Sequence, residues 1–378
     1  MNILIINTLY TPFKVGGAEV SVQLLAEELA ASGNKVRVVC LHDKSQREKK
    51  VINDVEVVYL PLKNVYWPFD DSKKGKVKKI LWHLFDSYNL LMAAAVEHEL
   101  DDFKPDVVHT NNVSGFSVAV WDVVKRKKIR LVHTTRDYYL FHHNCTLFKN
   151  GENMDVSSRK IRILSAIKRW RSKNIDAFVG ISDYISELHK NNGYAKNAKY
   201  THIYNPINSH VIDSAPAEQV RVGFIGRLTA DKGFADFCHM AKKTQQHRDI
   251  TYFAAGRLPG NDEGKAMQRL AEEAGVTLVG FVPADDFLAS IDMLLLPTRW
   301  NEPFGRVVAE GASAGKHVFA SFTGGIKEIA DFYSNVYELN EFTPERVRAL
   351  KNQPPGLPES NPFDVMTLAS SYQNIYQK

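Results

Sequence analysis

The chain has 378 residues, enough for two or three domains that each bury a core. Its 44% hydrophobic and 24% charged residues are typical of a soluble globular protein, and a net charge of +5 does not by itself indicate a nucleic-acid partner. Three widely spaced cysteines predict neither a disulfide framework nor a zinc site and favour a reducing compartment. We expect no signal peptide and no membrane span, and therefore a cytoplasmic protein.

The first 41 residues predict a strand, a helix and a second strand. Residues 3–6 and 36–41 are apolar runs of the kind that is buried in a parallel sheet. Between them, Gly16 and Gly17 precede a segment with helical apolar spacing that ends before Gly33. A glycine turn at a helix start can bind an anion, although alone it is more simply a tight turn. No Gly-x-Gly-x-x-Gly occurs in the chain, which argues against an NAD or FAD site.

Two stretches combine helical apolar spacing with many cations. Residues 73–100 carry five lysines near their start, and residues 159–173 contain Ile163, Leu164 and Trp170. Cations at a helix N-terminus oppose the helix macrodipole, so local helix stability does not explain the lysines. Two interpretations stay open, namely contact with a membrane surface and a solvated basic face over an ordinary core stripe.

The middle of the chain predicts five further strands, at residues 55–60, 106–109, 129–135, 177–180 and 199–204. A loop after the third of these contains His142 and His143. The two histidines are adjacent in sequence and therefore a poor pair for one metal ion, so we expect loop histidines and no metal site.

The β/α pattern restarts after a polar stretch, residues 208–219, which predicts a domain boundary. A strand at 221–225 runs into GRLTADKGF, residues 226–234, and then into a helix. Arg227 and Lys232 flank this turn, and two cations beside a helix N-terminus predict a clamp for a diphosphate. The alternative is a surface turn held by ion pairs.

A pair of acids follows the strand at 293–296. Glu302 precedes a Pro-Phe-Gly turn, and Glu310 lies eight positions later, about two turns into the helix expected after Gly305. The free N–H groups of that helix start are a further site for phosphate. The alternative is a helix N-terminus with a favourably placed acid and one solvated glutamate.

The Glu-x7-Glu spacing, the segment Gly-Arg-Leu-x3-Lys-Gly that begins at Gly226 and the Gly-Gly-Ala-Glu at Gly16 resemble motifs of the retaining glycosyltransferases of family 4, which have the GT-B fold. The resemblance implies an α/β protein with two Rossmann-like β/α/β domains facing across a cleft. The expected N-terminal, acceptor-side domain spans residues 1–207 and is followed by a linker, residues 208–219. The expected nucleotide-sugar-binding domain spans residues 220–360, and a C-terminal helix, residues 361–378, is expected to cross back to the first domain.

The resemblance also implies site residues. Four would be catalytic: Glu302, Arg227, Lys232 and Arg136. Glu302 would contact the donor sugar, and Arg227 and Lys232 would bind the donor diphosphate. The donor-binding residues would be Gly16, Gly17, Gly226, Gly256, Phe281, Val282, Phe304, Gly305, Arg306, Val307 and Glu310. Within this set, Glu310 would hold the ribose hydroxyls, and backbone near Phe281 would meet the base.

One position departs from the family pattern. Relatives often have His-Asp-Tyr at a strand end where this chain has Arg136-Asp137-Tyr138. An arginine cannot act as a base at ordinary pH. It would instead bind a hydroxyl, a sugar carboxylate or the donor phosphate, and the departure admits a homologue without catalytic activity.

The resemblance implies a retaining glycosyltransferase that moves a sugar from a UDP- or GDP-sugar to a hydroxyl of a glycan or lipid-linked acceptor in bacterial surface polysaccharide synthesis. The chain has no Asp-x-Asp, so neither a metal nor another cofactor is indicated. The alternative is a non-catalytic nucleotide-sugar-binding homologue or partner subunit, and a weaker one is an epimerase or phosphorylase of the same fold. The basic stretches 73–100 and 159–173 suit a protein at the inner face of the membrane.

Overall fold

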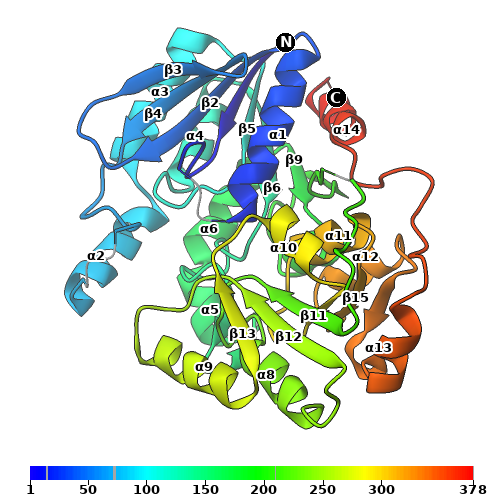
Figure 1. The fold of residues 1–378 in the computed structure, drawn as a ribbon. Coiled ribbons are helices and arrows are strands. Elements are labelled where there is room, and N and C mark those ends of the chain that lie inside the picture. The colour runs from blue at the N-terminus through cyan, green and yellow to red at the C-terminus, as the bar shows by residue number, and fades with distance from the viewer. Residues whose placement is uncertain (14–15, 71–73, 209, 378) are drawn as a thin grey trace. The chain divides into compact units, whose positions relative to one another are not determined.

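The computed structural model describes residues 1–13, 16–70, 74–208 and 210–377. The chain divides into two compact units (Figure 1). Unit 1 comprises Met1–Leu147, Asp155–Pro206 and Val365–Lys378, and unit 2 comprises Phe148–Met154 and Ile207–Asp364. Each unit has its own mostly parallel sheet, with helices on both faces, so the chain is an α/β protein of two Rossmann-like domains.

Unit 1 contains an eight-stranded sheet in the order β10-β9-β6-β5-β1-β2-β4-β3. Every neighbouring pair is parallel except β3 and β4. β1 supplies the first βαβ crossover on one side and pairs with β5 on the other, so the strand order reverses between β1 and β5. The strands are β1 (Asn2–Ile6), β2 (Lys35–His42), β3 (Glu48–Ile52), β4 (Val55–Pro61), β5 (Val107–Thr110), β6 (Arg130–Thr135), β9 (Ala177–Gly180) and β10 (Lys199–His202).

Helices cover both faces of this sheet. Val22 and Leu25 of α1 share a buried core with Ile3 of β1 and with Leu368 of the C-terminal helix α14. The opposite face carries α3, α4 and α7, and Trp121 of α4 meets the ring of His133 there. The helices of unit 1 are α1 (Gly17–Ala31), α2 (Lys76–Ser87), α3 (Leu90–Phe103), α4 (Ala119–Arg126), α5 (Arg159–Leu164), α6 (Ala166–Arg171), the short η1 (Ser172–Asn174), α7 (Asp183–Asn191) and α14 (Val365–Gln377).

Unit 2 contains a six-stranded, all-parallel sheet in the order β13-β12-β11-β14-β15-β16. The order reverses between β11 and β14, because β12 and β13 lie on one side of β11 and the later strands on the other. The strands are β11 (Val220–Ile225), β12 (Ile250–Ala255), β13 (Val276–Gly280), β14 (Met293–Leu296), β15 (His317–Ala320) and β16 (Val336–Glu338).

The two faces of the second sheet are covered by different helices. Phe224 stacks on Phe234 and Phe237 of α8, whereas Leu294 on the other face packs against Gly311 of α11. The helices of unit 2 are α8 (Phe234–Lys243), α9 (Asp262–Glu273), α10 (Ala284–Ser290), α11 (Arg306–Ser313), α12 (Ile326–Ala330), η2 (Leu339–Glu341) and α13 (Pro344–Leu350).

Residues 148–154 fall within the expected first domain, residues 1–207, but belong to unit 2, where they contain a short hairpin. It consists of β7 (Phe148–Lys149) and β8 (Glu152–Asn153). The Asn153 side chain donates to the carbonyl of Arg299 at 2.8 Å and accepts from the backbone N–H of Asn301 at 3.0 Å. The hairpin therefore attaches to the loop after β14 through one amide, which no local sequence pattern indicates.

The two expected basic helices are each interrupted. The first is α2 followed by α3, because the side chain of Asn89 caps α3 by accepting from the N–H of Met92 at 3.1 Å. Lys73 lies outside the described residues. The second breaks at the buried Ser165 into α5 and α6. None of the helices in the described part of the chain is long and apolar enough to cross a membrane.

The C-terminal helix is fixed to unit 1 by polar contacts in its core. The hydroxyl of Tyr376 and Nδ1 of the fully buried His109 are 2.7 Å apart, and Nε2 of His109 is 2.7 Å from Thr134 Oγ1. Burial lowers the pKa of His109 well below its usual value, so the ring is neutral. Removing one partner would leave a buried polar atom of the ring unsatisfied.

We predict that Tyr376→Phe lowers the free energy of unfolding by about 1–3 kcal/mol, because His109 loses a hydrogen bond that water cannot replace. Urea unfolding measures this change. Tyr10→Phe is the matched control, since the Tyr10 hydroxyl is buried without a partner among the described residues. Equal losses in the two variants would contradict the account.

Candidate functional site

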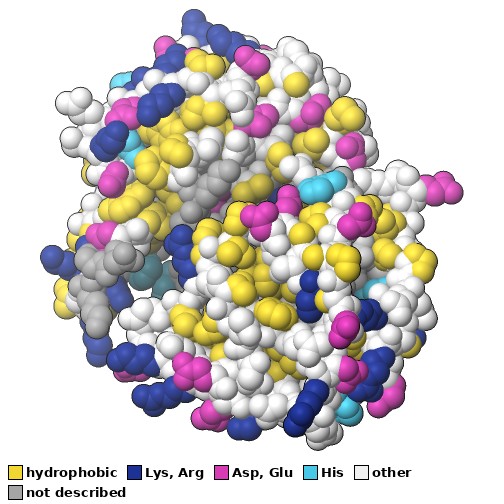
Figure 2. Space-filling view, in the orientation of Figure 1, with side chains coloured by type: hydrophobic (Ala, Val, Ile, Leu, Met, Phe, Trp, Pro, Cys, Tyr) yellow, Lys and Arg dark blue, Asp and Glu magenta, His cyan; other side chains and the backbone are white. Residues whose placement is uncertain are grey.

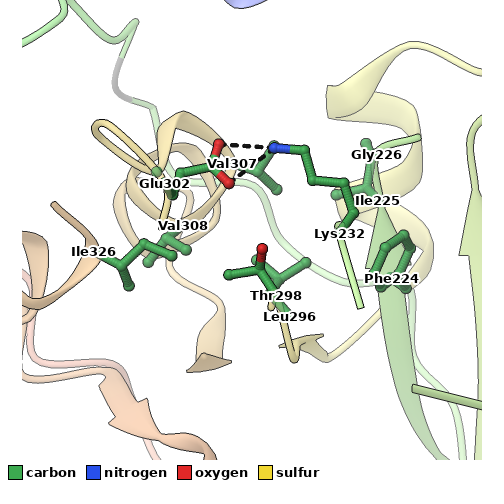
Figure 3. A pocket seen from close by; sticks show the side chains of 11 residues that line it. Phe224, Ile225, Gly226, Lys232, Leu296, Thr298, Glu302, Val307, Val308 and Ile326 are labelled. Carbon is green, nitrogen blue, oxygen red and sulfur yellow. Dashed lines mark hydrogen bonds and ion pairs between the residues drawn. The ribbon is translucent and has the colours of Figure 1, made fainter. Parts of the chain in front are cut away.

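A pocket in unit 2 lies where the strand order reverses. It is formed at the carboxyl ends of β11 and β14 and at the start of α11 (Figure 3). In doubly wound sheets this crevice is the usual place for a ligand. The lining residues are Phe224, Ile225, Gly226, Lys232, Leu296, Thr298, Glu302, Gly305, Val307, Val308 and Ile326.

An ion pair spans the pocket. Lys232 Nζ lies 2.8 Å from both carboxylate oxygens of Glu302, and Figure 3 shows the two side chains pointing toward each other. The same ammonium group lies 4.5 Å from the centre of the Trp300 ring. Lys232 comes from the turn after β11 and Glu302 from the loop after β14, so the pairing depends on these strands being neighbours.

The loop that carries Glu302 is held by close backbone contact. The N–H of Gly325 donates to the carbonyl of Glu302 at 2.8 Å. Gly324 has φ +60, and a Cβ there would clash with the backbone of Glu302. Only a glycine allows the two backbone segments to come this close, which explains why the Gly-Gly pair packs against the loop that carries Glu302.

The N-terminus of α11 opens into the same pocket. Gly305 caps the helix with φ 97 and without a side-chain hydrogen bond to its first turn, and Gly305 and Val307 line the pocket. Arg306 and Glu310 form an ion pair of 2.7 Å on this helix. Burial raises the pKa of the Glu310 carboxyl, and the Arg306 guanidinium opposes that shift.

Arg227 lies beside this pocket but does not line it. Its side chain is 57% exposed and pairs with Asp231 four residues later, at 2.6 Å. The expected clamp of Arg227 and Lys232 is therefore separated in the structure, with one cation paired inside the pocket and the other at the surface.

The remaining residues expected in unit 2 lie at the carboxyl ends of its strands. Gly256, with φ +148, packs against the carbonyl of Gly226. Phe281 is 72% exposed, its ring lies 4.5 Å from the Arg257 guanidinium, and Val282 follows it. Phe304 is buried and packs edge-on against Phe363, so its side chain belongs to the core and only its backbone is available to a ligand.

The expected residues of unit 1 are separate from this pocket. Gly16 precedes α1, and its N–H donates to the carboxylate of Glu19 at 2.9 Å; Gly17 is the first residue of the helix. Arg136 is buried: its Nε donates to Asn111 Oδ1 at 2.8 Å, and a second guanidinium nitrogen donates to Asn205. The guanidinium therefore links the ends of β5 and β6 to the segment after β10.

The rings of the two loop histidines pack against each other. The ring of His143 lies 3.9 Å from that of His142 and 4.1 Å from that of His83 of α2, and burial lowers the pKa of His143 to about 3. No group of three or more His, Cys, Asp or Glu residues suited to a metal ion occurs among the residues that the structure describes.

Sequence reasoning missed part of the pocket. Thr298, whose hydroxyl donates to the carbonyl of Asp231 at 3.1 Å, lines it together with Ile326. Trp300 borders Lys232. Thr298 and Trp300 could have been predicted from their position in the sequence, because they lie in the loop between the end of β14 and Glu302.

Two family models match the chain. The model of Glycosyltransferase Family 4 matches residues 15–211, and that of Glycosyl transferases group 1 matches residues 219–345. A protein of Klebsiella pneumoniae described as an uncharacterized 42.6 kDa protein in cps region is 45% identical over 342 residues, which cover 90% of each chain. An uncharacterized glycosyltransferase of Methanocaldococcus jannaschii is 24% identical, over 87% of this chain and 82% of its own.

Solved structures show the same fold at low identity. A sucrose-phosphate synthase from Thermosynechococcus elongatus superposes with a TM-score of 0.69 and 17% identity, covering all of this chain and 98% of its own. The Anabaena protein HepE in complex with UDP and glucose has a TM-score of 0.67 and 16% identity, covering 100% and 99%. The fold is GT-B, and the chain belongs to Glycosyltransferase Family 4 as a GT-B glycosyltransferase.

Proposed function

We propose that this protein is a retaining glycosyltransferase that moves a sugar from a nucleoside-diphosphate sugar to a hydroxyl of a glycan or lipid-linked acceptor. The observation that carries the proposal is the Lys232–Glu302 ion pair in the pocket beside the N-terminus of α11. This places a cation, a carboxylate and free backbone donors around one pocket. A sugar diphosphate offers partners for all three.

The diphosphate would bind where positive charge already gathers. Glu302 pairs with the Lys232 ammonium group, and a phosphate oxygen would take the place of that carboxylate. Exposed Arg227 can turn from Asp231 toward the same phosphates, and the first N–H groups of α11 add further donors. These cations would stabilise the leaving nucleoside diphosphate without a metal ion.

The carboxylates would then position the rest of the donor. Released from Lys232, Glu302 is available to accept hydrogen bonds from sugar hydroxyls. Glu310, held by Arg306 within the same helix, is placed to bind ribose hydroxyls. Several solved relatives of the fold are complexes with UDP or UDP-glucose, which supports a UDP-sugar as the first donor to try, with a GDP-sugar as the second.

The stereochemical course rests on the family. We propose same-face substitution, in which the departing phosphate helps to remove the proton of the acceptor hydroxyl, and the anomeric configuration is retained. No enzyme nucleophile is part of this path. The name of the 45% identical Klebsiella relative, which refers to a cps region, supports a role in bacterial surface polysaccharide synthesis.

The second candidate is a nucleotide-sugar-binding protein without transferase activity. The reason for considering it is Arg136, because an arginine cannot act as a base at ordinary pH. The structure gives this arginine amide partners on Asn111 and Asn205, so a structural role is sufficient to account for it. Transfer activity in the wild-type protein separates the two candidates directly.

We predict that Glu302→Gln lowers the rate of transfer at least about 100-fold, because a carboxylate that contacts the sugar in the transition state is lost. Affinity for the nucleoside diphosphate should stay the same or rise, since Lys232 loses its competing partner. Product formation and calorimetric titration measure the two effects.

The matched control is Glu273→Gln, which breaks another Glu–Lys pair of unit 2, the one between Glu273 of α9 and Lys242 of α8. This variant should keep wild-type activity. Transfer that persists in Glu302→Gln would remove the role proposed for this residue.

We further propose that unit 1 contacts the membrane through a docking surface made by α2, α5 and α6. Lys76, Lys78 and Lys79 lie on α2, where Figure 2 shows dark blue and yellow side chains together at the left. The apolar residues of this surface are exposed, by 41–75%: Val77, Ile80, Leu81, Leu84, Phe85, Ile163, Leu164 and Trp170. An ordinary core stripe would be buried, whereas these side chains of α2 are exposed.

The helices of the docking surface are joined by contact. The ring of His83 of α2 packs against that of His143, whose pKa is lowered by burial first and to a lesser extent by nearby charges that include Lys160 of α5. The Arg171 guanidinium lies over both Trp170 of α6 and Tyr88 at the end of α2. Exposed apolar side chains flanked by cations are the pattern of a helix that lies in the interface of an anionic membrane.

We predict that Leu84→Ser with Phe85→Ser weakens partitioning onto phosphatidylglycerol vesicles at least about tenfold, since each side chain contributes roughly 1.5–3 kcal/mol when buried. Co-sedimentation measures the partitioning. The control is Val51→Ser with Met366→Ser, two exposed apolar residues of the same unit outside the docking surface. Equal behaviour of the two double variants would rule out this surface.

A further inference from the structure

A second pocket lies in unit 1 between the α5–α6 segment and the turn that follows α7. Its lining residues are Arg162, Arg169, Asn191, Asn192, Gly193 and Lys196. Three of the six are cations, two are amides, and no acid lines the pocket. None of these residues belongs to the proposed donor site, which lies in unit 2.

The three cations are uncompensated. Within the described part of the chain, Arg162, Arg169 and Lys196 form no ion pair with a carboxylate. Like charges that line one pocket repel each other, and an anion that enters between them relieves this repulsion. The pocket therefore has the charge of an anion site.

The guanidinium of Arg169 is already positioned. One of its terminal nitrogens donates to Ser165 Oγ at 2.6 Å, and the group lies over the Tyr194 ring at 5.4 Å. Its Nε–H has no acceptor among the described residues. A guanidinium held by packing loses less conformational entropy when it binds a ligand.

The backbone leaves room beside this guanidinium. Gly193 has φ +76, and a Cβ there would lie 3.4 Å from Lys196 Cε and 4.0 Å from Arg169 Cδ. A side chain at this position would come into van der Waals contact with both cationic side chains. Asn192 next to it is fixed, because its amide donates to the carbonyl of Leu188 at 2.8 Å.

We propose that this pocket binds a phosphate ester, with Arg162, Arg169 and Lys196 as its ligands. Arginine presents several N–H donors in a plane, which match the oxygens of a phosphate group in a bidentate arrangement. Ile163, 75% exposed, and Leu164 follow Arg162 directly. A phosphate that carries an acyl chain, such as a phospholipid headgroup, would place its apolar part on these side chains, whereas a soluble phosphate ester would use the cations alone.

The experiment compares two double variants of equal charge. Arg162→Gln with Lys196→Gln removes two cations of the pocket. Arg159→Gln with Lys199→Gln removes one cation from the same helix α5 and one from β10, three residues away in each case and outside the pocket lining. The probes are inorganic phosphate and glycerol 3-phosphate by calorimetry at constant ionic strength, and vesicles of phosphatidylglycerol or phosphatidylcholine by co-sedimentation.

We expect the pocket variant to bind glycerol 3-phosphate or phosphatidylglycerol vesicles at least about tenfold more weakly than the control variant. Pocket-dependent binding of the soluble probes would identify a free phosphate ester as sufficient, and pocket-dependent binding of the anionic vesicles alone would identify a lipid phosphate. Equal binding by the two variants for every probe would overturn the proposal. UDP titration of both variants reports separately on unit 2, so failure of the donor site would be recognised on its own.

Discussion

The ion pair between Lys232 and Glu302 is the contact on which the candidate site depends. The two residues are 70 positions apart and meet only because β11 and β14 are neighbours at the point where the strand order of unit 2 reverses. The pairing compensates both charges, which are each about four-fifths shielded from solvent. A ligand with both phosphate and hydroxyl groups offers a partner to each half of the pair.

The two units use their charged residues in different ways. In unit 2 the Lys232–Glu302 pair lies at the carboxyl edge of the sheet, beside the backbone N–H groups at the start of α11. In unit 1 a buried arginine, Arg136, is satisfied by amides and ties strand ends together, while cations on α2, α5 and α6 lie beside exposed apolar side chains.

Apolar runs were sufficient to predict most strands, because strands buried on both faces of a parallel sheet are continuously apolar and do not alternate between apolar and polar residues. β3 was missed since its sequence, EKKVI, is an exposed antiparallel edge. The local signals of the site, Gly305 and the paired acids, were also readable. The pairing of Lys232 could not be predicted from sequence, because it depends on the order of the strands in the sheet. The break at Asn89 could not be predicted either, because the Asn89 cap interrupts a continuous helical pattern of apolar residues.

The most direct test of the donor site is calorimetric titration of the wild-type protein, Arg227→Ala and Arg348→Ala with UDP, GDP and ADP. Arg348 pairs with Asp249 at the opposite, amino edge of the same sheet and is the matched control. The account predicts that the wild type and Arg348→Ala bind one of the three nucleotides and that Arg227→Ala binds it at least about tenfold more weakly. Binding of none of the three by the wild type, or equal binding by both variants, would contradict it.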